Sequence, residues 1–193
     1  SPFRAFGSVP NIDWSDPSVR FIDLTGDGFA DVVMSEDRVY TWYPSLREGG
    51  YGEPRQATRY TDEERGPSVV FAEAEQTVFL ADMSGDGLVD LVRIRNGSVC
   101  YWPNLGYGDF GAEVRMADAP LLDGPDAFDA RLVRLADLSG AGPADLIYLG
   151  GAEIRIWVNL SGNGFAEGRS LGRLPGRGPA TGVGVFDILG HGT

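Results

Sequence analysis

Apolar residues along the chain come in short alternating runs, and one order of runs recurs. A short apolar lead-in precedes a loop rich in aspartate and glycine, and a β-branched run follows the loop. Next comes an alternating run that ends in tryptophan, at Trp42, Trp102 and Trp157. A turn that closes on an aromatic residue and a more polar fourth run complete each repeat. Period-two alternation of this length indicates half-buried β-strands.

The aspartate loops of the three repeats begin at Asp23, Asp82 and Asp137, and a shorter fourth loop begins at Asp187. Four short strands in about 50 residues are typical of a β-propeller blade. The sequence therefore predicts an all-β fold, a partial β-propeller of about three four-stranded blades that form one segment, 1–193. The expected blades are 18–59, 77–116 and 131–172, with a truncated fourth unit at 181–193.

A propeller ring needs at least about four blades, so we expect the chain to be a fragment of a larger ring. The opening stretch "FGSVPNIDW" could be the outer strand of a preceding blade. A stack of three repeats that is stable alone is the alternative.

The aspartate loops resemble the first nine positions of an EF-hand-like calcium loop, in which carboxylates gather around a glycine turn. The candidate ligands of the first loop are Asp23, Thr25, Asp27, the Phe29 carbonyl and Asp31, and those of the second are Asp82, Ser84, Asp86, the Leu88 carbonyl and Asp90. The third loop keeps Asp137, Ser139 and Asp145 but has Ala141 at the fifth position, which predicts weaker binding. No loop carries the acidic twelfth residue that gives an EF-hand its bidentate ligand.

The alternative interpretation is that these loops are turns without metal. Each aspartate would then accept backbone N–H groups and hold a corner between two strands. The altered third loop favours this alternative, because the repeat tolerates the loss of a carboxylate. In both interpretations the loops serve architecture and not catalysis.

The formal charge of −12 predicts a surface that repels nucleic acid and anionic membranes. We find no apolar run long enough to span a bilayer and no signal peptide. The single cysteine, Cys100, excludes an internal disulfide and lies on an alternating strand. The single histidine, His191, has no nucleophile signature beside it. The paired carboxylates all belong to the repeated loops, so we predict that the chain is not an enzyme.

Several phrases carry a family resemblance. The pattern of aspartate loop followed by "NLGYGDFG" or "NLSGNGFA" resembles the FG-GAP/VCBS repeats of integrin α-subunits and of many bacterial extracellular proteins. The longer phrases "VRFIDLTGDGFADVV", "LADMSGDGLVDLVRIRNGSVCYWPNLGYGDFG" and "VRLADLSGAGPADLIYLG" are similar to the propeller region of the B component of bacterial Tc insecticidal toxin complexes, and of related virulence-plasmid and RHS-associated proteins.

This resemblance implies a secreted, non-catalytic module that attaches to the pore-forming A component, gates the passage of the toxin and belongs to an assembly with the C component. It implies no catalytic residue, no organic cofactor and no membrane insertion by this segment. We expect the acidic inserts 60–76 and 116–130 to be variable contact surfaces, because loops outside the repeat are free of blade packing. A carbohydrate-binding or adhesion propeller module is the alternative, and a carbohydrate-binding module would need exposed tryptophans.

Overall fold

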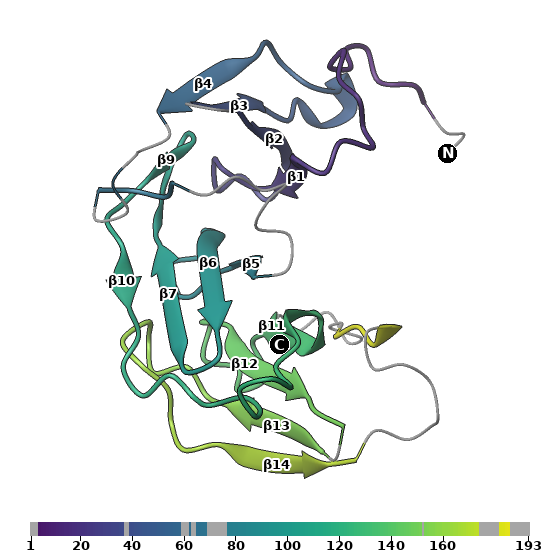
Figure 1. Ribbon diagram of the computed structural model, residues 1–193. Coiled ribbons are helices and arrows are strands. Elements are labelled where there is room, and N and C mark those ends of the chain that lie inside the picture. Colours follow the sequence, from purple (N-terminus) through teal and green to yellow (C-terminus); the bar gives the residue numbers. More distant parts are fainter. Residues whose placement is uncertain are drawn as a thin grey trace. The chain divides into compact units, whose positions relative to one another are not determined.

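The computed structural model describes residues 4–36, 39–58, 62, 65–68, 77–151, 153–173 and 182–185. Strands dominate this part of the chain, and its helical segments are two short 3₁₀ turns, η1 (Arg47–Gly49) and η2 (Ala130–Leu132) (Figure 1). Among the same residues there is no helix with the length and apolar character needed to cross a membrane.

Three antiparallel sheets follow one another along the chain, and each has four strands. The first contains β1 (Val19–Ile22), β2 (Asp31–Ser35), β3 (Val39–Tyr43) and β4 (Arg55–Thr58). The second contains β5 (Val78–Ala81), β6 (Asp90–Arg95), β7 (Ser98–Trp102) and β10 (Val114–Arg115). The third contains β11 (Val133–Ala136), β12 (Asp145–Leu149), β13 (Ile154–Trp157) and β14 (Arg169–Gly172). The fold is therefore all-β and corresponds to part of a β-propeller, as the sequence predicts.

The register within each sheet follows from the alternating pattern and from the turn residues. In the second sheet Arg95 pairs with Ser98, so Asn96 and Gly97 form the two-residue turn between β6 and β7. Gly97 has φ +79°, a left-handed conformation that glycine adopts without steric cost. This turn fixes which side chains of both strands share a face.

A small hairpin lies after the third strand of each repeat. In the second repeat it is formed by β8 (Asn104–Gly106) and β9 (Asp109–Phe110). Single bridges stand at the same place in the other repeats, Ser45 with Tyr51 and Asn159 with Phe165. These hairpins correspond to the turns that the sequence predicts to close on an aromatic residue.

The chain divides into two compact units, one of residues 1–75 and 104–113 and one of residues 76–103 and 114–193. Within the first unit, Tyr40 and Trp42 on β3 are fully buried. Phe110 of the β8–β9 hairpin packs edge-on against Tyr40, with ring centroids 6.1 Å apart. The hairpin of the second repeat thus completes the core of the first blade.

Within the second unit, the second and third blades share one apolar core. Met83 and Tyr101 of the second repeat pack there with Leu146, Trp157 and Phe165 of the third. The other face of the third blade has its own cluster, formed by Ile147, Leu149 and Ile156, and Val183 and Val185 pack against it. The alternation in "EIRIW" therefore sends Ile156 and Trp157 to opposite faces, as expected.

The insert 116–130 was expected to be free of blade packing, and this reason for its being a contact surface is wrong. The insert 116–130 is anchored in the second unit, because Leu122 is fully buried in the shared core. The Asn96 side chain accepts from Leu122 N at 2.7 Å and donates to the Asp123 oxygen at 2.8 Å. Blade packing therefore holds this insert, although Leu121 is exposed. Most of the insert 60–76, and Asp187 and His191 of the fourth repeat, lie outside the described residues.

Candidate functional site

The first aspartate of each loop closes a turn by accepting backbone N–H groups. Asp23 Oδ1 accepts from the amides of Thr25, Gly26 and Asp27, and Asp23 Oδ2 accepts from Gly28 N at 2.7 Å. Partial burial raises the pKa of the Asp23 carboxyl, but these hydrogen bonds outweigh it and hold the pKa below its ordinary value.

The ninth residue of each loop is a buried aspartate, and in the first and third repeats it joins the loop to the following hairpin. Asp31 Oδ2 accepts from Leu24 N at 3.0 Å, and Oδ1 accepts from Ser45 N at 2.7 Å. Asp145 does the same in the third repeat, with Leu138 N at 3.0 Å and Asn159 N at 2.9 Å. Burial is the largest influence on Asp31 and raises its pKa above the ordinary value.

The third loop keeps this geometry although Ala141 replaces the central acid. Asp137 accepts from the amides of Gly140, Ala141 and Gly142 at 2.7, 3.1 and 2.8 Å. In the first two loops the central carboxylates, Asp27 and Asp86, accept only one further amide each, from Phe29 and Leu88. The turn therefore depends on the first and ninth aspartates and not on the fifth residue.

The loop carboxylates have other partners in the structure. The oxygens of Asp23 and Asp31 already accept backbone amides, and Asp27 lies 3.9 Å from the guanidinium of Arg47. Among the described residues no three His, Cys, Asp or Glu side chains are grouped so that they could hold a metal ion. The geometry favours the turn-forming interpretation, and calcium binding stays a prediction.

An asparagine in each of the later hairpins connects a repeat to the loop before it. Asn159 is buried, and its Nδ2 donates to the backbone oxygens of Met83 and Ala144, both at 3.0 Å. Its Oδ1 accepts from Gly162 N at 2.8 Å. In the first unit Asn104 donates to the Asp23 oxygen at 3.4 Å. The pattern of apolar and polar residues does not single out these asparagines, although the repeated "NL" dipeptide marks them.

The three repeated tryptophans are buried, and each carries an arginine over its ring. Their exposed fractions are 1%, 0% and 6% for Trp42, Trp102 and Trp157. Arg55, Arg93 and Arg155 lie 5.2, 5.0 and 5.2 Å from the centroids of these rings, in the same order. The three tryptophans therefore serve packing, and their burial counts against a carbohydrate-binding module. The Cys100 thiol is likewise buried and is not part of a disulfide.

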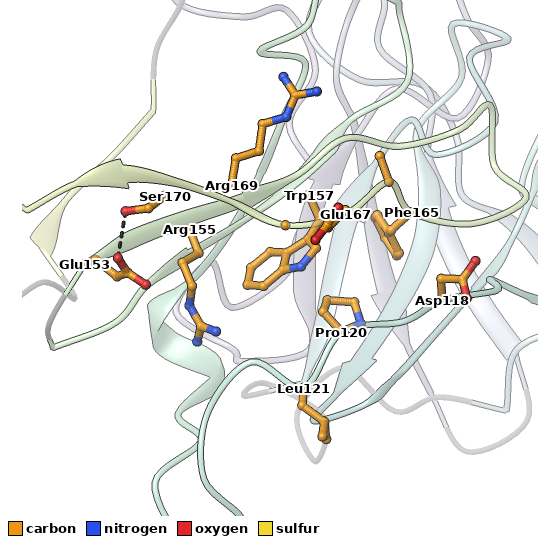
Figure 2. A pocket seen from close by; sticks show the side chains of 12 residues that line it. Asp118, Pro120, Leu121, Glu153, Arg155, Trp157, Phe165, Glu167, Arg169 and Ser170 are labelled. Atoms are coloured by element: carbon orange, nitrogen blue, oxygen red, sulfur yellow. Dashed lines mark hydrogen bonds between the residues drawn. The ribbon is translucent and has the colours of Figure 1, made fainter.

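A groove of about 770 Å³ lies beside β13 and β14 in the second unit (Figure 2). Side chains of both charges line it, including Glu153, Arg155, Glu167 and Arg169. Glu153 accepts from the Ser170 hydroxyl at 2.7 Å on one side of the groove, and Arg155 donates to the Leu122 oxygen. Glu153 and Arg155, two of the lining residues, therefore have structural roles.

Each hairpin also presents an exposed leucine at the position after Ser45, Asn104 or Asn159. Leu46, Leu105 and Leu160 are 53%, 64% and 51% exposed. A large apolar side chain is thus exposed at the same hairpin position in all three repeats. The periodic pattern alone could not show this, because leucine in a repeat is usually buried.

Comparison with solved structures relates the chain to toxin complexes. It superimposes on a chain of the Tc holotoxin pore of Photorhabdus luminescens with a TM-score of 0.70, and the two are 30% identical over 88% of the present chain. It superimposes on a chain of a TcdB2–TccC3–Cdc42 crystal structure with a TM-score of 0.51 and 20% identity over 81%. The chain spans 8% and 12% of these two proteins.

A lectin of Agrocybe aegerita that recognises non-reducing terminal N-acetylglucosamine shares the fold. The TM-score is 0.55 at 21% identity, over 77% of this chain and 36% of the lectin. No protein-family model and no curated protein matches the sequence. At the level of fold, the chain is a Tc-toxin-like structural module.

Proposed function

We propose that the chain is a non-catalytic docking module of a secreted Tc-toxin-like B subunit. It attaches to the pore-forming component and takes part in gating the passage of the toxin. The observation that carries this proposal is the 30% identity, over 88% of the chain, with the Photorhabdus holotoxin structure. The sequence resemblance to the B-component propeller supports the same role.

The arrangement of the loops supports a structural role. The carboxylates that could have suggested acid–base chemistry accept backbone amides in all three repeats, as Asp23 and Asp137 do. An enzyme would need carboxylates at a substrate cleft that are not already hydrogen-bonded to backbone amides. The exposed leucines of the hairpins supply apolar area for contact with another protein, and the acidic character of the chain favours a partner with a basic surface.

Binding to a purified Tc pore-forming subunit tests this proposal. The chain is immobilised and the affinity is measured by interferometry at two salt concentrations. We expect saturable binding that weakens at higher salt, because charge complementarity is screened. Replacement of the three hairpin leucines, Leu46→Ser, Leu105→Ser and Leu160→Ser, should lower the affinity about tenfold or more, since exposed apolar anchors dominate many interfaces.

Leu171→Ser is the matched control, because Leu171 lies on β14 and is 57% exposed. This variant should bind as the unaltered chain does. Equal losses in the control and the triple variant would show that the hairpins are not the contact, and no binding by the folded chain would overturn the docking role.

Carbohydrate binding is the second candidate, and the groove beside Trp157 is the observation that favours it. Arg155, Arg169 and two glutamates could donate and accept hydrogen bonds to sugar hydroxyls. The buried Trp157 ring does not offer a stacking face, and the likeness to the lectin is one of fold. A glycan array separates the candidates: binding that Arg169→Ala abolishes would support a lectin-like module instead of a docking one.

A further inference from the structure

We propose that Asn163 is a site of spontaneous deamidation, and that the isoaspartate it forms loosens the joint between the second and third repeats. Asn96 is the other asparagine that precedes a glycine, and the fold protects it. The inference concerns the chemical lifetime of the module and is independent of the docking role proposed above.

An asparagine followed by glycine can lose its side-chain amide without an enzyme. The glycine nitrogen attacks the side-chain carbonyl carbon, a new N–C bond closes a succinimide ring, and the proton of that nitrogen leaves with the side-chain NH2 as ammonia. Water then opens the ring at either carbonyl and gives aspartate or isoaspartate. Glycine favours the attack because it has no Cβ to block the approach. The dipeptide is the same at both places, so the folded surroundings decide the two rates.

The Asn96 side chain is held by both of its polar atoms. Its Oδ1 accepts from Leu122 N at 2.7 Å and from Asp123 N at 3.3 Å, and its Nδ2 donates to the Asp123 oxygen at 2.8 Å. The attacking nitrogen is also engaged, because Gly97 N donates to the Pro120 oxygen at 3.0 Å. Ring closure at Asn96 therefore requires all of these hydrogen bonds to break.

Asn163 lies at the tip of the hairpin of the third repeat and is exposed. Its Nδ2 donates to the Ser161 oxygen at 3.0 Å, a contact within the tip itself. Among the described residues its Oδ1 accepts no hydrogen bond and Gly164 N donates none. The side-chain carbonyl and the attacking nitrogen thus both lack the hydrogen bonds that hold Asn96 and Gly97.

The backbone of this hairpin tip is strained. Ser161 has φ +53° and Gly162 has φ +77°, so a residue with a side chain stands in the left-handed region. Asn163 N donates to the Leu160 oxygen at 3.2 Å, at the long end of the usual range. Local opening of the tip relieves the strain, and the same opening lets the nitrogen of the following glycine reach the Asn163 side chain.

The backbone of Asn163 also joins two repeats. Ala117 N, just after β10, donates to the Asn163 oxygen at 2.8 Å, and Phe165 N donates to the Ala117 oxygen at 3.2 Å. A Cβ on Gly164 would lie 2.9 Å from the Ala117 oxygen, so there is no spare room. In isoaspartate the backbone runs through Cβ and Cγ, which lengthens it by a carbon and turns the original carbonyl into a side-chain carboxylate. The two hydrogen bonds cannot both keep their geometry in this space.

Ageing of the whole chain tests the proposal. The chain is held at pH 8 and 37 °C, and peptide mapping by mass spectrometry follows the replacement of amide by carboxyl. We expect Asn163 to deamidate at least about tenfold faster than Asn96 in the folded chain, because Asn96 reacts only after several hydrogen bonds open. In guanidinium the two rates should agree within about threefold, since unfolding removes the contacts that protect Asn96. Equal rates in the folded chain, or a difference that persists in guanidinium, would overturn the proposal.

Hydrogen exchange at the Ala117 amide measures the effect on the joint. Exchange in the isoaspartate fraction should be at least about tenfold faster than in fresh protein, because the amide has lost its acceptor. Asn163→Asp is the matched control: it adds the same charge without lengthening the backbone, and should change this exchange by less than about twofold. Asn163→Gln should stay unmodified through the same incubation and keep the exchange rate of fresh protein.

Two results would contradict the effect on the joint. An equal acceleration in Asn163→Asp would assign it to charge, and unchanged exchange in the isoaspartate fraction would show that the contact with Ala117 survives the modification. Either result would overturn the proposal.

Discussion

Asn159 Nδ2 lies 3.0 Å from the backbone oxygen of Met83, so a side chain in the hairpin of the third repeat holds the aspartate loop of the second. Asn159 is 4% exposed, and its second Nδ2 bond goes to the Ala144 oxygen. One amide group therefore joins two repeats and the turn of its own hairpin.

Asn159→Ala should destabilise the protein by about 2–3 kcal/mol, because it leaves buried carbonyl and amide groups without partners. The measurement is urea unfolding followed by tryptophan fluorescence. Asn163→Ala is the control, since the side chain of exposed Asn163 donates to the Ser161 backbone oxygen in the same hairpin. Equal effects of the two substitutions would show that the connection to Met83 contributes nothing.

The first and fifth residues of the aspartate loop should differ in importance. Asp23→Asn replaces one carboxylate oxygen with an NH2 donor, so the Gly28 amide loses its acceptor, and the change should cost about 1–3 kcal/mol. Asp27→Asn should change the free energy of unfolding by less than about 0.5 kcal/mol, because the third loop has Ala141 at this position and keeps its turn. If the loop binds calcium, both substitutions should lower the free energy of unfolding, by an amount that grows with the calcium concentration.

Calcium titration complements these variants. Because the carboxylates already accept amides, we expect the melting temperature to be the same in EDTA and in millimolar Ca²⁺. A ligand present at 100 times its dissociation constant adds about 2.7 kcal/mol, so binding would be readily visible. A rise that Asp27→Asn abolishes would establish the calcium ligands expected from the sequence.

Asp23 and Asp31 should respond to pH in opposite directions. The pKa of Asp23 is lowered on folding, so its contribution is present above the unfolded value of about 3.9 and is lost as pH falls through the folded pKa. The pKa of Asp31 is raised, so stability falls as pH rises through its folded value. The stability difference between the unaltered chain and Asp23→Asn should shrink from pH 6 to pH 3, and the difference for Asp31→Asn should grow. Parallel curves for both variants would contradict this assignment.

Two glycines of the β8–β9 hairpin allow the cost of backbone strain to be measured separately from the cost of a close contact. Gly106 and Gly108 both have φ +87°, but a Cβ on Gly108 would lie 2.7 Å from Trp42 Nε1, whereas one on Gly106 would meet nothing within 4 Å. Gly106→Ala should cost about 1 kcal/mol from strain alone. Gly108→Ala should cost at least about 1 kcal/mol more, because it displaces the hairpin from the tryptophan. Thermal unfolding compares them, and equal losses would show that the contact is loose.

The sequence predicted the repeated sheets because period-two alternation and the aspartate loops are local signals. Strands such as β12 and β13 fall where the pattern of apolar residues places them. The roles within the loops were harder to predict: the same carboxylate can accept amides or hold a cation, and the sequence does not show that the Gly26 and Gly28 amides lie against Asp23. Asn159 and Leu122 contact residues that are distant in the sequence, and no local pattern indicates such partners.

The compact units do not coincide with the sequence repeats, since residues 104–113 belong with the first blade. A fragment cut at the end of the first repeat would therefore uncover Trp42 and Tyr40, although its sheet would keep all four strands. The smallest piece of this chain worth excising for study ends beyond Phe110. Any scheme that swaps or deletes repeats should place its junctions one hairpin downstream of the boundary visible in the sequence.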